Sequence, residues 1–465
     1  MISSLHIRQH MRVIGLILLG SIVMLRLAFY NSFPFVYPDT GTYIRSGYEL
    51  ILPIDRPIFY GLFIRLLSFS TTLWNVVIFQ SLITAYLIYL TLRTFIHDKL
   101  FNFYYLLLIA VLSITTGISF NVSMLTPDIF TSCLFLSMFI LMTVPEINNF
   151  HKVSLYLILI TSILTHHSHV LIAILSVFIS YFLIGLLKYN RTNNYLKLLI
   201  PIGFSLVIAV FTNYSLSHKW NISQASHAFI LNKLHENELL VPYLTKHCTK
   251  SPSYLCALKD SLPWDLIWDS KSPITNSGDW NLHKSEDEGL IKAILISPEF
   301  GSLFLLKSFQ QTIKQLFKFN TGDAPTGDMA IPPLIEIRTH LPSERKEFLA
   351  GLQFNKLLDF NILNAIQTVV VYLSLCILIL PFVLKENYWD FKLKQGILLL
   401  MVFEICNAFI CSSFSTVLDR YQSRIIWLIP LFALIILLQI LLKQYDIQNS
   451  GNKQDELSSF KNTSE

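Results

Sequence analysis

Long apolar runs constrain this chain more than any other feature of its sequence. Hydrophobic residues make up 53% of its 465 residues and charged residues only 14%, whereas soluble proteins carry roughly 25% charged residues. A helix needs about 17–25 apolar residues to cross a bilayer. Runs close to this length lie near 12–30, 74–95, 103–121, 128–144, 153–166, 169–187, 196–216, 361–383, 395–416 and 424–442. The sequence therefore predicts an all-α polytopic membrane protein with about ten transmembrane helices.

The Lys and Arg residues beside these runs predict the orientation of the chain. With 217–360 and the tail after Lys443 left out, one side carries twelve such residues and the other carries five. Cytoplasmic loops carry the excess of positive charge, so both termini are expected in the cytoplasm. The basic N-terminus also suits a signal peptide, but no small-residue cleavage site follows it, which favours an uncleaved first span. We expect a multi-pass protein of the cell inner (plasma) membrane.

This topology divides the chain into four predicted parts. Residues 1–216 form an N-terminal transmembrane module whose amphipathic first outer loop spans 31–73, and residues 217–360 form an extracytoplasmic domain. Residues 361–443 form the C-terminal transmembrane helices. Residues 444–465 are polar and are expected to be a disordered cytoplasmic tail.

The mid-chain segment 217–360 carries two further signals. Apolar residues at helical spacing in 299–318 predict an amphipathic helix that packs on a domain core or on the membrane surface. Cys248 and Cys256 would lie in an oxidising compartment, which predicts a disulfide between them. Their spacing matches no zinc pattern, and the other four cysteines lie within apolar runs as small hydrophobic residues.

The first outer loop concentrates charge among aromatic residues in a chain that otherwise avoids charge. The stretch 37–43 predicts a turn that presents the carboxylate of Asp39; a helix N-cap is the alternative. Asp55, Arg56 and Pro57 predict a second turn that leads into an amphipathic helix, with a structural Asp55–Arg56 ion pair as the alternative role.

Other ionisable residues map to the ends of spans, and the predicted topology puts all of them at the same outer face as Asp39. Ionisable groups near spans are functional candidates because charge is costly in the bilayer. They are Asp128, His166, His167, His169, Asp419 and Arg420.

Each of these candidates also has a structural alternative. Asp128 suits the N-terminus of a helix, and Arg420 suits an interfacial arginine that reaches toward the headgroups. The three histidines could bind a metal, contact substrate or phosphate, or pack at the interface. The chain has no G-x-S-x-G, Gly-rich phosphate loop or H-E-x-x-H, and its scattered basic residues exclude a nucleic-acid partner.

Taken together, these motifs resemble the membrane-integral glycosyltransferases of the GT-C class, which include protein mannosyltransferases and bacterial aminoarabinose transferases. The resemblance rests on Tyr37-Pro38-Asp39 with Tyr43, on Asp55-Arg56-Pro57, on a second acid at Asp128, and on Arg420-Tyr421 before a last span that contains Pro430. It covers mostly 12–216. Two departures concern the acceptor: Thr40 stands where many relatives have a second acid, and the large outer segment lies in mid-chain.

The resemblance implies single-displacement transfer of a sugar from a polyprenyl-phosphate donor at the extracytoplasmic face, with inversion at the anomeric carbon. Asp39 would be the base, and Asp128 would be its helper or a group that positions the acceptor, whereas Arg56 and Arg420 would bind the phosphate. The remaining expected contacts to substrate or phosphate come from Asp55, Tyr43, His166, His167, His169 and Tyr421. The acceptor would be a glycan, lipid or protein, and membrane lipid is a further partner. No motif requires a metal, although the acids and histidines could bind a divalent ion.

Three other classes of function stay open. A transporter or flippase of lipid-linked glycans would place charges or broken helices near the midplane of several spans. Here the spans are nearly free of internal charge, and the exceptions are Arg26, close to the outer end of the first span, and Glu404 within the ninth. A non-catalytic envelope assembly protein would use 217–360 to bind a partner. An outer-face acyl- or phosphotransferase would share the placement of Asp and His.

Overall fold

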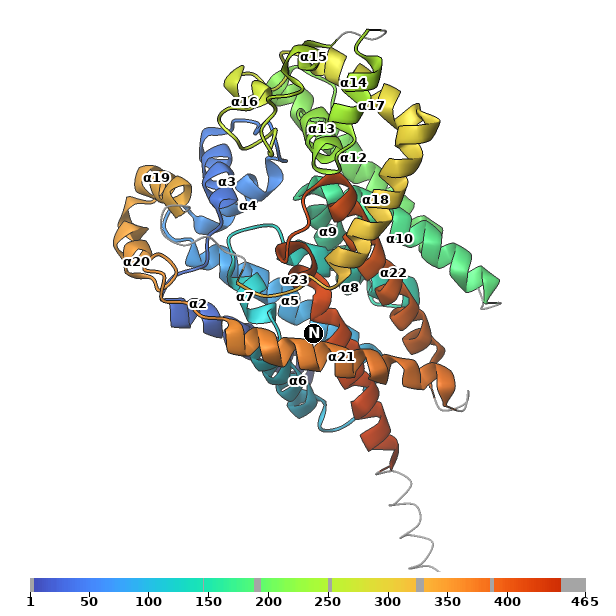
Figure 1. Ribbon diagram of the computed structural model, residues 1–465. Helices are drawn as coiled ribbons and strands as arrows, with labels where there is room; N and C mark the ends of the chain where they lie inside the picture. The colour runs from blue at the N-terminus through green and yellow to red at the C-terminus, as the bar shows by residue number, and fades with distance from the viewer. Residues whose placement is uncertain are drawn as a thin grey trace, which may run out of the picture.

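The computed structural model describes residues 4–144, 146–187, 194–249, 253–322, 330–384 and 389–444. In these residues the regular elements are helices, joined by loops, with an isolated β-bridge between Phe35 and Met124 (Figure 1). The helices of the first half are α1 (Ser4–Met24), α2 (Arg26–Asn31), α3 (Pro38–Glu49), α4 (Phe59–Ser68), α5 (Trp74–Phe95), α6 (Phe101–Thr115), α7 (Ile118–Ser123), α8 (Ile129–Thr143), α9 (Asn149–Leu164), α10 (His167–Leu186), α11 (Asn194–Lys197) and α12 (Leu199–Ser217). Those of the second half are α13 (Ser226–Glu236), α14 (Leu240–His247), α15 (Tyr254–Leu258), α16 (Pro273–Asn276), α17 (Lys284–Ile296), α18 (Pro298–Leu316), α19 (Ile331–His340), α20 (Arg345–Ala350), α21 (Asn361–Val383), α22 (Phe391–Phe414) and α23 (Arg420–Ile426).

Six described helices are long and apolar enough to cross a membrane. They are α5, α10, the continuous pair α11–α12, α21, α22 and the helix that begins with α23 and runs over Arg420–Gln444. Large apolar side chains on these helices face outward, among them Phe182, Ile200 and Leu373, which are 60–72% exposed. Exposed apolar surface of this extent suits lipid rather than water. The predicted class of helical membrane protein is therefore confirmed.

The other four predicted spans correspond to shorter apolar helices. These are the His10–Met24 part of α1 together with α6, α8 and α9. A helix of fifteen residues rises about 23 Å, which is less than the ~30 Å hydrocarbon core of a bilayer. The number of ten spans stays a prediction. The apolar pair at 153–187 is two helices, α9 and α10, which meet at Thr165 and His166.

The first loop, 31–73, folds into two packed helices, α3 and α4. The predicted turn at 37–43 is wrong, because α3 begins there with Pro38 at its N-terminus and Asp39 in its first turn. Proline suits the first helical position, where its missing N–H has no partner to lose. Thr40 Oγ1 accepts from the backbone N–H of Tyr37 at 2.9 Å, which closes the helix start. The predicted amphipathic helix after Pro57 is α4.

Residues 217–360 contribute to two separate cores. Helices α13–α18 enclose their own apolar cluster, which includes Leu231, Leu244 and Ile294, and form a helical lobe at the top of Figure 1. By contrast, α19 packs against α3, and α19 and α20 both belong to the main core through Ile337 and Phe348. The close approach of α19 to α3 needs a glycine, because a Cβ on Gly41 would lie 2.8 Å from the Pro332 backbone.

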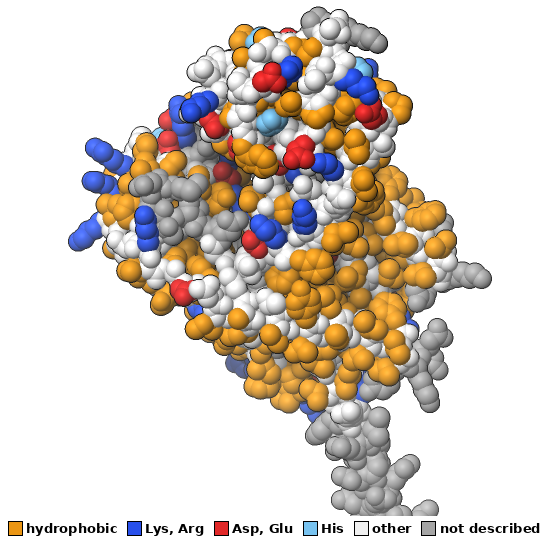
Figure 2. All heavy atoms as spheres, viewed as in Figure 1, with side chains coloured by type: hydrophobic (Ala, Val, Ile, Leu, Met, Phe, Trp, Pro, Cys, Tyr) orange, Lys and Arg blue, Asp and Glu red, His pale blue; other side chains and the backbone are white. Residues whose placement is uncertain are grey.

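The predicted amphipathic helix at 299–318 is α18, which meets α17 at an angle of 87°. Its predicted apolar stripe points away from the lobe core: Leu306, Phe309 and Ile313 are 54–61% exposed. Helix α18 also lies against α22, where Thr312 contacts Ser412 and the ring of Phe309 lies beside that of Phe409. In Figure 2 this apolar surface continues over α21 and α22, whereas charged side chains gather over the lobe and over α19 and α20.

Candidate functional site

Three aspartates and three arginines from four distant segments form one chain of ion pairs. In order it runs Asp55, Arg56, Asp39, Arg420, Asp128, Arg424, and each member pairs with the next. We call this set the ionic chain. Its formal charges cancel, which offsets the large desolvation penalty of charges buried this deeply.

Asp39 is held between two guanidinium groups. Arg56 Nη1 lies 3.0 Å from Asp39 Oδ1, and Arg420 Nη1 lies 3.0 Å from Asp39 Oδ2. Arg56 also donates to Asp55, which precedes it in the loop between α3 and α4. Asp39 lies in the first turn of α3, where the positive end of the helix dipole favours a carboxylate. One carboxylate therefore joins two cations from opposite ends of the sequence.

Asp128 anchors the deep end of the ionic chain. It lies at the N-terminus of α8 and accepts from Thr126 Oγ1 at 2.7 Å. Arg420 Nε approaches Asp128 Oδ2 at 2.7 Å, and Arg424 Nη1 approaches Asp128 Oδ1 at 3.3 Å. The side chains of Asp128 and Arg424 are at most 1% exposed, whereas Asp39 is 24% exposed. Asp39 is thus the carboxylate of the ionic chain most accessible to a ligand.

Tyrosine rings flank the arginines. The guanidinium of Arg420 lies 4.2 Å from the ring centroid of Tyr37, and that of Arg56 lies 5.1 Å from the ring centroid of Tyr43. A cation over an aromatic face is stabilised by the ring quadrupole. The ring of Tyr421 lies beneath Arg424 instead, and its hydroxyl contacts Ser415 Oγ at 3.0 Å. These rings restrict where the guanidinium planes can point.

The three predicted histidines have different environments. His169 Nδ1 lies 2.5 Å from the Ser162 carbonyl, to which it must donate, and its Nε2 contacts the hydroxyl of Thr131. Both ring nitrogens of His169 therefore hold α10 against its neighbours rather than a ligand. His166 caps α10 by accepting from Ser168, and it lies within electrostatic reach of Arg420 and Arg424. His167 lies within electrostatic reach of Asp55 and Arg56.

The arginines determine the charge state of Asp39. Burial raises the pKa of this carboxyl, but the charges of Arg56 and Arg420 more than offset burial, so the pKa lies below its ordinary value. Asp39 is therefore ionised at neutral pH. An anionic ligand that drew the arginines away from Asp39 would raise this pKa and make the carboxylate a stronger base.

Arg424 is a functional candidate that was not predicted from the sequence. It follows Arg420 by one helical turn, and both reach Asp128. That spacing was the signal that could have identified it. Asp419 lies beside the ionic chain without joining it, since its carboxylate accepts from the backbone N–H of Asn320.

The Cys248–Cys256 pair forms a disulfide, the pairing that the sequence analysis expects. It joins the end of α14 to α15 in the helical lobe. The bond lies within the lobe and contributes no group to the ionic chain.

Comparisons with family models, curated proteins and solved structures found no match to this chain.

Proposed function

We propose that this protein is an integral membrane glycosyltransferase that moves a sugar from a polyprenyl-phosphate donor to an acceptor at the extracytoplasmic face. The observation that carries the proposal is the Asp39 carboxylate, partly exposed and held between Arg56 and Arg420. Two convergent guanidinium groups suit a phosphate, which arginine binds through paired hydrogen bonds. The carboxylate between them suits the proton of an attacking hydroxyl.

The reaction we propose is a single displacement. The acceptor oxygen forms a bond to the anomeric carbon as the bond from that carbon to the phosphate oxygen breaks. The acceptor proton passes to Asp39, and the polyprenyl phosphate leaves with the bonding electrons. Arg56 and Arg420 stabilise the charge that develops on the departing phosphate. As the phosphate engages these arginines, Asp39 loses part of their field and gains basicity.

In this proposal Asp128 positions Arg420 and takes no part in the proton transfer. It is buried and bound to Arg420, Arg424 and Thr126, so it holds the phosphate-binding arginine in place. His166 and His167 lie within electrostatic reach of the arginines and complete a polar wall around the donor phosphate. We therefore propose that Asp128 positions Arg420 and does not contact the acceptor.

The membrane face follows from the positive-inside pattern and is supported by the disulfide. A bond between Cys248 and Cys256 suits an oxidising compartment, which the periplasm provides and the cytoplasm does not. We accordingly assign the ionic chain to the outer face of a cell inner membrane, with both termini in the cytoplasm.

The test is glycan analysis with an Asp39→Asn variant. Mass spectrometry of envelope glycolipids and glycoproteins should show one sugar modification that requires the wild-type gene. Asp39→Asn should abolish this modification while the variant accumulates in the membrane at the wild-type level. Asp390→Asn is the matched control: Asp390 caps α22 through Lys392 N, and asparagine caps equally well, so activity should persist.

Full modification by the Asp39→Asn variant would remove this residue from the mechanism. Identical envelope glycans with and without the gene would contradict the glycosyltransferase assignment. Flux of a lipid-linked glycan across vesicles that contain the purified protein and no acceptor would favour a flippase instead.

A further inference from the structure

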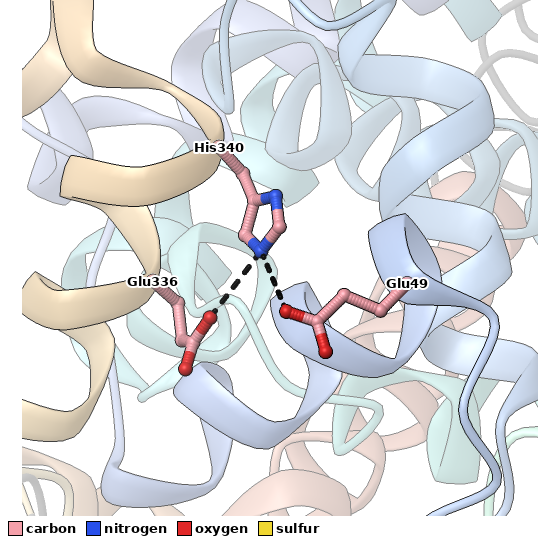
Figure 3. Close-up of side chains that lie close together, drawn as sticks. All are labelled: Glu49, Glu336 and His340. Atoms are coloured by element: carbon pink, nitrogen blue, oxygen red, sulfur yellow. Dashed lines mark ion pairs between the residues drawn. The ribbon is translucent and has the colours of Figure 1, made fainter.

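We infer that the protein has a zinc site outside the ionic chain, formed by Glu49, Glu336 and His340. Glu49 is the last residue of α3, and the other two residues lie one turn apart on α19. Figure 3 shows the two carboxylates on opposite sides of the imidazole, with Nε2 directed between them. Their candidate ligand atoms all lie within 4.8 Å of one another.

The imidazole nitrogen is placed for a cation. His340 Nε2 lies 3.5 Å from Glu49 Oε1 and 3.4 Å from Glu336 Oε2, and it is buried without a hydrogen-bond partner. A charged N–H···O hydrogen bond would measure about 2.7–2.9 Å. One N–H could also point at only one carboxylate. Two nearly equal, longer separations instead suit three ligand atoms around a common centre.

These separations discriminate between metals. With metal–ligand distances of about 2.05 Å, neighbouring ligand atoms in a tetrahedral zinc site lie about 3.3–3.4 Å apart. Neighbouring ligands in an octahedral magnesium site lie only about 2.9 Å apart. The two separations between His340 Nε2 and the carboxylates, 3.4 and 3.5 Å, fit the tetrahedral case. An imidazole nitrogen is also a preferred zinc ligand, whereas magnesium prefers oxygen.

Surrounding side chains hold the ligands in place. Arg45 Nε donates to Glu49 Oε2 at 3.0 Å, which leaves Oε1 for the metal. The ring of Tyr48 stacks on that of His340 with centroids 4.9 Å apart. Outer groups of this kind orient the ligands of known metal sites. Glu49 is 34% exposed, so the site has access to solvent for metal entry and for water as a fourth ligand.

The zinc would join α19 to the helix that carries Asp39. Asp39 lies in the first turn of α3 and Glu49 at its end, about 15 Å along the helix axis. A metal bound to both α3 and α19 therefore limits the motion of α3 relative to α19. Zinc binding itself does not depend on the proposed glycosyl transfer.

The test is metal analysis of the full chain, purified in detergent without a histidine tag. The protein is stripped with a chelator, dialysed against zinc chloride and then against metal-free buffer, and analysed by mass spectrometry. We expect about one zinc per chain, unchanged when magnesium is present in excess. His340→Ala and Glu336→Gln should each weaken zinc affinity at least about tenfold. His247→Ala in the lobe and Glu347→Gln on α20 are matched controls and should retain the zinc.

A thermal melt separates loss of ligand from loss of fold. Added zinc should raise the Tm of the wild type and of both controls, because a ligand bound only by the folded state stabilises it. The Tm of His340→Ala and Glu336→Gln should not respond. A wild type without stoichiometric zinc, or equal zinc in all five proteins, would overturn the site. Neither result would bear on Asp39.

Discussion

Exposure falls steadily along the ionic chain from Asp39, which is 24% exposed, to Arg424, which is fully buried. We therefore expect Asp39 and the buried Asp128–Arg424 pair to have different roles. A partly exposed carboxylate can meet a ligand, whereas a buried ion pair is expensive to break because the remaining charge has no water to solvate it. Substitutions at the two aspartates should separate function from stability.

Asp128→Asn should destabilise the protein strongly. It leaves Arg420 and Arg424 with an uncompensated buried charge, and breaking a buried pair costs about 3–5 kcal/mol. We expect a large drop in Tm, measured by thermal unfolding in detergent. Asp39→Asn, which is nearer solvent, should lower the Tm by less than Asp128→Asn does. Equal Tm values for wild type and Asp128→Asn would mean that Asp128 is not the anchor of the ionic chain.

Arg56→Gln should shift the pH dependence of activity. Since Arg56 lowers the pKa of Asp39 and burial raises it, removing the arginine raises this pKa. A base must be deprotonated, so the acidic limb of the kcat/KM profile should move to higher pH. In the wild type, the same depressed pKa stabilises the fold above the ordinary pKa, and this contribution is lost as pH falls through the folded value.

The control for this profile is Arg345→Gln on α20, whose acidic limb should match the wild type. An unshifted limb in Arg56→Gln would show that Asp39 is not the titrating base. If the limb is unshifted and kcat/KM is also lower, Asp39 is again excluded as the titrating base, and the role of Arg56 is limited to binding phosphate.

At the scale of elements, α3 depends on two glycines that let its neighbours approach. A Cβ on Gly47 would lie 2.1 Å from the carbonyl oxygen of Gly61 in α4, and a Cβ on Gly41 would lie 2.8 Å from the backbone of Pro332 in α19. Helix backbones approach this closely only where a side chain is missing. The position of Asp39 therefore depends on packing along all of α3.

Gly47→Ala should separate α3 from α4. The added methyl group meets backbone rather than a flexible side chain, so the helices must move, at a typical cost of about 1–3 kcal/mol. We expect a lower Tm and reduced activity. Gly289→Ala in α17 is the matched control: nothing lies within 4 Å of its added Cβ, and alanine favours a helix by about 1 kcal/mol over glycine. Similar losses in both variants would contradict this account of α3.

At the scale of the whole molecule, charged residues gather over the helical lobe and the α19–α20 segment, away from the apolar surface over α18, α21 and α22 (Figure 2). The ionic chain draws on the N-terminal module through Asp39 and Asp128 and on the last span through Arg420. It therefore requires the ends of the sequence to meet in the folded protein.

Labelling of introduced cysteines tests the orientation. Trp264 in the lobe is 73% exposed, so Trp264→Cys should react with a membrane-impermeant maleimide added outside intact inner-membrane spheroplasts. Lys99, exposed between α5 and α6, is expected in the cytoplasm, and Lys99→Cys should react only after permeabilisation. The unsubstituted protein shows the background. The reverse pattern would put the ionic chain in the cytoplasm.

The membrane class and most helix positions could be predicted from the sequence, because apolar length is a local property that needs no partner. The sequence also identified Asp39, Asp55, Arg56, Asp128 and Arg420 as candidates, since charge is conspicuous beside apolar spans. It missed the helical start of α3 at Pro38, where the turn signal of Asp, Thr and Gly competed with a proline that suits the first helical position.

The pairing of the charges and the sharing of a core between elements could not be predicted from the sequence. Arg420 meets Asp39 across 381 positions of sequence, a distance over which no periodicity carries information. The same holds for α19, which packs on α3 rather than in the helical lobe and so brings His340 to Glu49. Pairing depends on packing, burial and the requirement that buried charge be neutralised, and these are properties of the assembled fold.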